Sequence, residues 1–140
     1  MINKIQKAII GGILGTTVMT FVLFGAPLVG LPKLSPPQML STMFGFPMLE
    51  GWLMHFMIGI NFAMIFVFAI GRVLKKINNT MLKGAIFGVF AFIFGQIMIS
   101  ILGTLFNEAP SVAGSMMQVM MESILGHLSF GIVVVLYVNA

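Results

Sequence analysis

Residues 84–107 read GAIFGVFAFIFGQIMISILGTLFN, a stretch of 24 residues without a charged or histidine side chain. Residues 8–32 also lack such groups, whereas residues 51–71 and 123–140 each contain a single histidine. A helix needs about 20 mostly apolar residues to cross the hydrocarbon core of a bilayer, which is about 30 Å thick. The sequence therefore predicts an all-α, polytopic membrane protein. The four predicted transmembrane helices cover about residues 8–29, 51–72, 83–106 and 118–138.

The composition of the whole chain excludes a soluble globular protein. Of its 140 residues, 59% are hydrophobic and 7% are charged, whereas about 25% of the residues of a soluble domain are charged. The net charge is +4, but the basic residues are too few to follow a phosphate backbone, so no nucleic-acid partner is expected. The chain has no cysteine, phosphate-binding loop or nucleophile motif, and we predict that it is not an enzyme.

The charged residues are segregated along the chain, which predicts its orientation. Six basic residues precede the first span or lie between the second and the third: Lys4, Lys7, Arg72, Lys75, Lys76 and Lys83. The loop at residues 28–50 contains only Lys33 as a basic residue. Because basic residues favour the cytoplasmic side, we expect both termini inside and the loops at residues 28–50 and 107–122 outside. The first span is longer than the apolar region of a signal peptide, about 7–15 residues, so we expect it in the mature protein.

Two segments 72 residues apart share one spacing of residues, which predicts an internal duplication. Glu50-x2-Leu53-x-His55-x3-Gly59-Ile60 recurs as Glu122-x2-Leu125-x-His127-x3-Gly131-Ile132. Upstream, Lys7-x2-Ile10-x-Gly12 matches Lys83-x2-Ile86-x-Gly88 at an offset of 76. With two spans in each unit the repeats are parallel, related by an axis along the membrane normal. We therefore predict a single membrane domain, residues 1–140, in which the hairpins 1–76 and 77–140 form an antiparallel four-helix bundle.

Small residues four apart share a helix face and predict where the helices touch, because lipid provides no hydrophobic drive for association. The glycines expected at these contacts are Gly12, Gly15, Gly59, Gly88 and Gly131. Asn61 and Gln96 are polar residues within the spans. We expect them to form interhelical hydrogen bonds, or else to line a path for a solute or proton.

The two outer loops are expected to carry short interfacial segments. Pro36-Pro37 predicts a short helix over residues 38–44, because proline suits the first helical turn. Residues 111–121 have a similar pattern and are expected to continue into the fourth span. Both segments are predicted to be amphipathic and to lie along the membrane interface.

His55 and His127 are the only histidines, and the duplication places them at equal depth. Ionisable side chains within spans point to function, so a b-type haem ligated by both residues, a bound metal and a proton relay are open hypotheses. The favoured interpretation is a hydrogen bond from each imidazole to a neighbouring helix. Glu50 and Glu122 precede the histidines by five residues. We interpret them as interfacial carboxylates at helix starts, although contacts with the other helices and proton exchange with the outside are the alternatives.

Fourteen methionines raise a second metal hypothesis, since thioether ligands select Cu(I). Methionine is also a flexible filler of irregular apolar contacts, and packing is the favoured interpretation.

Four motifs extend over most of the chain: Lys7-Ala8-Ile9-Ile10-Gly11-Gly12-x2-Gly15-Thr16, Gly51-Trp52-x2-His55-Phe56-x2-Gly59, Lys83-Gly84-Ala85-Ile86-x-Gly88 and Gly126-His127-x3-Gly131-Ile132. With these motifs the chain resembles a family of small four-helix membrane proteins of bacteria whose function is unknown. The resemblance implies a bacterial inner membrane and no particular substrate.

The leading functional hypothesis is an accessory or scaffold protein in the lipid bilayer that associates with itself or with a larger membrane complex. A redox protein that binds haem b or a metal through His55 and His127 is the first alternative. A small conductor of solutes or protons, lined by Asn61, Gln96 and the two histidines, is the second.

Overall fold

The computed structural model describes residues 3–106 and 114–139, which contain helices and no strand. The elements are α1 (Lys4–Gly25), η1 (Ala26–Val29), α2 (Pro36–Phe44), α3 (Met48–Ile65), η2 (Phe66–Ile70), α4 (Gly71–Val73), η3 (Leu74–Lys76), α5 (Thr80–Phe106) and α6 (Met116–Asn139). Four continuous helical stretches are long and apolar enough to cross a membrane: Lys4–Val29, Met48–Lys76, Thr80–Phe106 and Met116–Asn139. The predicted all-α architecture with four spans is confirmed.

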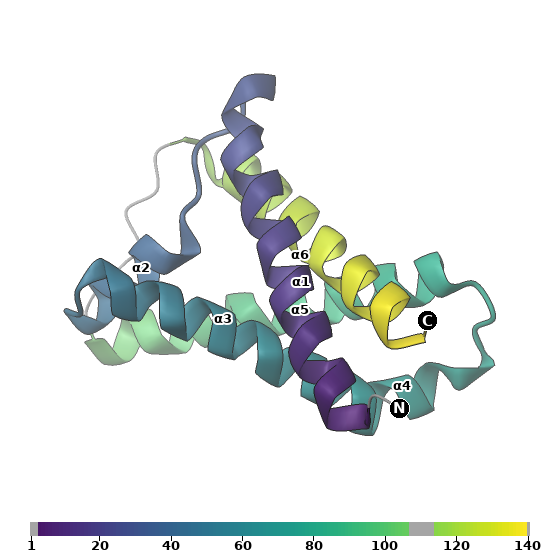
Figure 1. The fold of residues 1–140 in the computed structure, drawn as a ribbon. Helices are drawn as coiled ribbons and strands as arrows, with labels where there is room; N and C mark the ends of the chain where they lie inside the picture. Colours follow the sequence, from purple (N-terminus) through teal and green to yellow (C-terminus); the bar gives the residue numbers. More distant parts are fainter. Residues whose placement is uncertain (1–2, 107–113, 140) are drawn as a thin grey trace.

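The four long helices form two crossing pairs (Figure 1). Helices α1 and α6 pack along each other and cross over α3 and α5. We call the end where α1 and α5 begin the basic end, because Lys4, Lys7 and Lys83 lie there. The opposite end, where α2 packs on α3, is the α2 end. At the basic end, the ammonium group of Lys7 donates a hydrogen bond to the carbonyl oxygen of Val138 across 3.2 Å, which ties the start of α1 to the last turn of α6.

Local residue chemistry explains where the helices begin and end. Asn3 and Gln6 form reciprocal hydrogen bonds of 2.8 and 2.9 Å that cap the start of α1. The short helix predicted in the first loop is present as α2 and begins at Pro36, since proline needs no intrahelical partner in the first turn. It ends at Gly45, whose φ of 67° is a conformation that glycine adopts without strain.

The fourth span and the segment before it form one helix. α6 begins at Met116 and continues to Asn139 without a break. This agrees with the expectation that residues 111–121 run into the fourth span, for the part of that segment that the structure describes. Residues 107–113 lie outside the described residues.

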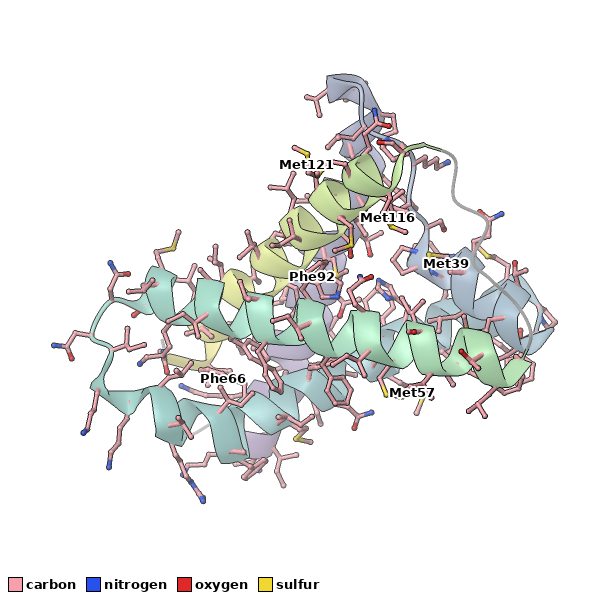
Figure 2. All side chains as sticks on the ribbon, turned by 180° about the vertical axis from the view of Figure 1, so that it is seen from behind. Met39, Met57, Phe66, Phe92, Met116 and Met121 are labelled. Atoms are coloured by element: carbon pink, nitrogen blue, oxygen red, sulfur yellow. The ribbon has the colours of Figure 1, made fainter. Side chains whose placement is uncertain are left out.

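The interior between the middle of the bundle and the basic end is filled by phenylalanine rings from three of the long helical stretches. Phe66 and Phe87 lie 4.9 Å apart between ring centroids, and Phe87 lies 5.9 Å from Phe130. Phe62 and Phe94 extend the contact between α3 and α5, at 5.5 Å. Figure 2 shows Phe66 between its own helical stretch and α5. These rings separate α3 from α5, so the two helices touch through side chains rather than through close backbone contact.

Two glycines allow the backbones of paired helices to meet, and they do so in the same way in both hairpins. A Cβ atom added to Gly12 would stand 2.6 Å from the Cα of Ile60, and one added to Gly84 would stand 2.6 Å from the Cα of Ile132. Both pairs of positions are separated by 72 residues. The contacts thus pair Gly12 with Gly84, whereas the sequence match at an offset of 76 pairs Gly12 with Gly88. Gly84 and Gly88 are four residues apart and occupy the same helix face, so a match by spacing alone can select either of them.

Candidate functional site

His55 is buried between α3 and α1. Its side chain is 6% exposed, and its Nε2 lies 3.4 Å from Oγ1 of Thr20 on α1. The Thr20 hydroxyl donates its own hydrogen to the carbonyl oxygen of Thr16 at 2.8 Å, so it is available to His55 only as an acceptor. This pattern assigns the proton of a neutral His55 to Nε2. The imidazole thereby joins the second span to the first.

His127 makes a different set of contacts between α6 and α5. Its Nδ1 lies 2.8 Å from the carbonyl oxygen of Ser123 on the same helix. Because a carbonyl oxygen only accepts, Nδ1 carries the proton and Nε2 of the neutral ring is an acceptor. Nε2 points at the backbone of α5, where a Cβ added to Gly95 would lie 3.4 Å away. The ring of Phe92 meets it edge-on, with centroids 5.8 Å apart.

The two histidines therefore face different neighbouring helices and use different ring nitrogens. A haem held by both would require the Nε2 of each, but Nε2 of His55 faces Thr20 on α1. His127 alone has the arrangement typical of a metal ligand, in which one nitrogen donates to a carbonyl and the other remains free. Among the described residues, no group of three or more histidine or acidic side chains is placed to hold a metal ion.

Gln96 and Asn61, both predicted as polar site residues, are used differently. The amide of Gln96 donates to Oγ of Ser123 at 3.2 Å and so joins α5 to α6 next to His127. Asn61 lies on the exposed face of α3 and donates to the carbonyl oxygen of Met57, one turn earlier, at 3.0 Å. Asn61 is therefore absent from the helix contacts, because its short side chain reaches the backbone of its own helix.

Glu122 differs most from expectation. Its side chain is 1% exposed, and its Oε1 accepts a hydrogen bond from the backbone N–H of Leu34 at 3.0 Å. Its other oxygen, Oε2, is buried and has no hydrogen-bond partner in the part of the chain that the structure describes. Glu122 is thus covered by the segment between η1 and α2 and does not lie open at the start of its helix. The sequence analysis did not identify Leu34 as a partner of Glu122. The one signal in the sequence is that Leu34 lies between Pro32 and Pro36, which favours an extended segment whose N–H groups are free to bond elsewhere.

Glu50 lies in the first turn of α3 and is partly exposed. This position agrees with the expected carboxylate at a helix start, where the partial positive charge of the helix favours an anion. One of its oxygens, Oε2, is buried without a partner.

Comparison with known proteins places the chain in a family. It matches the family of unknown function DUF6789 over residues 2–139, which is nearly its whole length. The chain belongs to DUF6789. No curated protein and no solved structure matches it.

The predicted packing glycines of this DUF6789 chain all lie at helix contacts. Gly12 and Gly59 bring α1 and α3 together, and Gly88 and Gly131 do the same for α5 and α6. Gly15 faces α6, where an added Cβ would stand 2.7 Å from Cγ2 of Val134 and 2.9 Å from the ring of Phe130. A side chain at any of these positions would push neighbouring backbones or rings apart.

The methionines of the DUF6789 chain are spread over several helices. Figure 2 shows Met116 and Met121 on α6, Met39 on α2 and Met57 on α3. The side chains of Met116 and Met117 are 78% and 70% exposed, and that of Met57 is 61% exposed. A Cu(I) site needs several thioethers directed at one point. The four labelled methionines lie on three different helices.

Proposed function

We propose that this chain is a non-enzymatic accessory protein of the bacterial inner membrane, with both termini on the cytoplasmic side. The charge distribution supports this orientation. All six basic residues outside the first loop belong to the segments that meet at the basic end, whereas Glu50 lies in the first turn of α3 and Glu122 lies two turns into α6, both toward the α2 end. Basic residues favour the cytoplasmic side of a bacterial inner membrane. The α2 end would then face outward.

The observation that carries the accessory role is a group of exposed methionines at the start of α6. We call Met116, Met117, Met120 and Met121 the methionine face; their side chains are 78%, 70%, 37% and 49% exposed. Flexible thioether side chains repack readily against different partners and are common at adaptable binding surfaces. The glycine contacts, by contrast, are already used between helices of the same chain. A partner is therefore more readily bound through the methionine face than through the small residues, which already contact helices of this chain.

Site-specific photo-crosslinking in native membranes tests this role. A photoreactive amino acid at Met117 is expected to form a protein adduct, either with a second copy or with another membrane protein. The matched control is Leu136, which is on the same helix toward the basic end and is 44% exposed. Adducts from position 117 and not from 136 support the proposal. Equal labelling at both positions, or lipid adducts alone at 117, would contradict it.

One observation favours a second candidate, a single-histidine ligand site. The hydrogen bond from Nδ1 of His127 to Ser123 fixes the tautomer and leaves the Nε2 lone pair free beside Gly95. This geometry supports His127 as a ligand more than it supports a bis-histidine haem. A conducting path has less support, because phenylalanine rings fill the interior toward the basic end.

A further inference from the structure

Glu122 is a buried acid that the accessory role does not use. It lies two turns into α6, and among the described residues its hydrogen-bond partner is the N–H of Leu34, 88 residues earlier in the chain. Leu34 is itself 6% exposed and belongs to the apolar core, against which Val119 of α6 packs. The carboxyl group therefore joins the loop at residues 31–35 to the fourth span in apolar surroundings.

Within residues 3–106 and 114–139, no charged group pairs with Glu122 as a counter-ion. Neither α2, nor α1 after Lys7, nor α5 after Lys83 contains a titratable side chain. Lys33 is next to Leu34, but its ammonium lies over the ring of Phe24, 5.6 Å from the centroid. The remaining titratable side chains on the packed helices at this end are Glu50 and His55 of α3 and His127 of α6. None of these is hydrogen-bonded to Glu122, and no other described residue bonds its Oε2.

An ionised carboxylate in this position would present two acceptor oxygens, and the N–H of Leu34 is the one donor bonded to them among the described residues. Burying such a charge without a counter-ion costs far more than burying a neutral polar group. The neutral acid keeps the same bond, since its carbonyl oxygen still accepts from Leu34, and leaves only a hydroxyl unpaired. The neutral form is therefore the one compatible with the docked loop.

We propose that Glu122 is a proton-binding site whose occupancy controls docking of the loop at residues 31–35. With the proton bound, Leu34 is fastened to α6 and the loop covers the carboxyl group. When the proton is lost, the carboxylate requires water or a cation, and the loop moves away to admit it. Rising pH at the α2 end therefore releases the loop and falling pH docks it.

Modification by dicyclohexylcarbodiimide, an apolar reagent selective for protonated carboxyl groups in apolar surroundings, tests the protonation state in the unaltered protein. The experiment is done near pH 7, well above the pKa of about 4.3 of an exposed glutamate. We expect an adduct on Glu122, found by mass spectrometry of the α6 peptide. The adduct should disappear in Glu122→Gln and persist on Glu122 in Glu50→Gln. Absence of an adduct on Glu122 in the unaltered protein overturns the proposal.

Hydrogen exchange tests the coupling to the loop. The protection factor of the peptide covering residues 31–35 should fall at least about tenfold between weakly acidic and alkaline pH, after correction for the intrinsic exchange rate. In Glu122→Gln the amide oxygen still accepts from Leu34 and cannot ionise, so the protection factor should not depend on pH. A pH-independent protection factor in the unaltered protein, or the same pH dependence in the Gln variant, overturns the coupling.

Discussion

Gly12 on α1 lies so close to α3 that a Cβ atom added to it would stand 2.6 Å from the Cα of Ile60 and 3.0 Å from the carbonyl oxygen of Gly59. Such a contact cannot be relieved by turning a side chain, because the atoms it meets belong to the backbone. Gly84 on α5 meets Ile132 and Gly131 at the same distances. Within each hairpin, the two helices are thus held together by the same kind of backbone contact.

Gly12→Ala and Gly84→Ala should therefore destabilise the protein by similar amounts. Overpacking of a close contact costs about 1–3 kcal/mol, and we expect both variants to fall in this range. Unfolding of the purified protein by SDS in mixed micelles measures the free-energy change. Gly25→Ala is the control, since a Cβ at Gly25 meets nothing within 4 Å. Stability of Gly12→Ala equal to that of Gly25→Ala would show that the two backbones are not in contact.

The bond between His55 and Thr20 predicts a smaller effect. Thr20→Val removes the acceptor of the Nε2–H group of His55 while keeping the shape of the side chain. Interhelical hydrogen bonds in membranes contribute about 0.6 kcal/mol on average, and we expect a loss of this order in the same SDS assay. Thr17→Val is the matched control, because the Thr17 hydroxyl donates to Ile13 of its own helix. An equal loss in both variants would show that the effect comes from the bond between each threonine hydroxyl and a carbonyl oxygen of its own helix, and not from the contact with His55.

The proposed orientation predicts which surface cysteines are accessible from outside the cell. The chain contains no native cysteine, so Lys33→Cys and Lys76→Cys each introduce a single thiol at an exposed position. A membrane-impermeant maleimide added to intact spheroplasts should label residue 33 and leave residue 76 unlabelled until the membrane is opened. Labelling of residue 76 alone would place the termini on the outside.

Hydropathy predicted the four spans because each stretch is apolar on all sides over its full length, and the packing glycines stood out as residues four apart. The neighbours of each histidine were beyond prediction, since they depend on how each helix is rotated and on which glycine sets its register. The match of Gly12 to Gly88 shows this difficulty: the backbone contacts pair Gly12 with Gly84, one turn earlier. The burial of Glu122 depends on the path of the loop through Leu34, which no periodic pattern encodes.

The internal duplication remains a prediction. At an offset of 72, Thr20 beside His55 corresponds to Phe92 beside His127. Positions 72 residues apart thus place a hydroxyl beside His55 and an aromatic ring beside His127.

We infer that His55 and Gln96 join neighbouring helices through hydrogen bonds to Thr20 and Ser123, and that the two histidines do not ligate a haem between them. The absorbance spectrum of the protein purified in detergent from haem-replete cells, recorded with metal analysis, tests this most directly. We predict a colourless protein without a Soret band and without stoichiometric metal, both as purified and after incubation with haem. A Soret band in the unaltered protein that disappears in both His55→Ala and His127→Ala would contradict the claim.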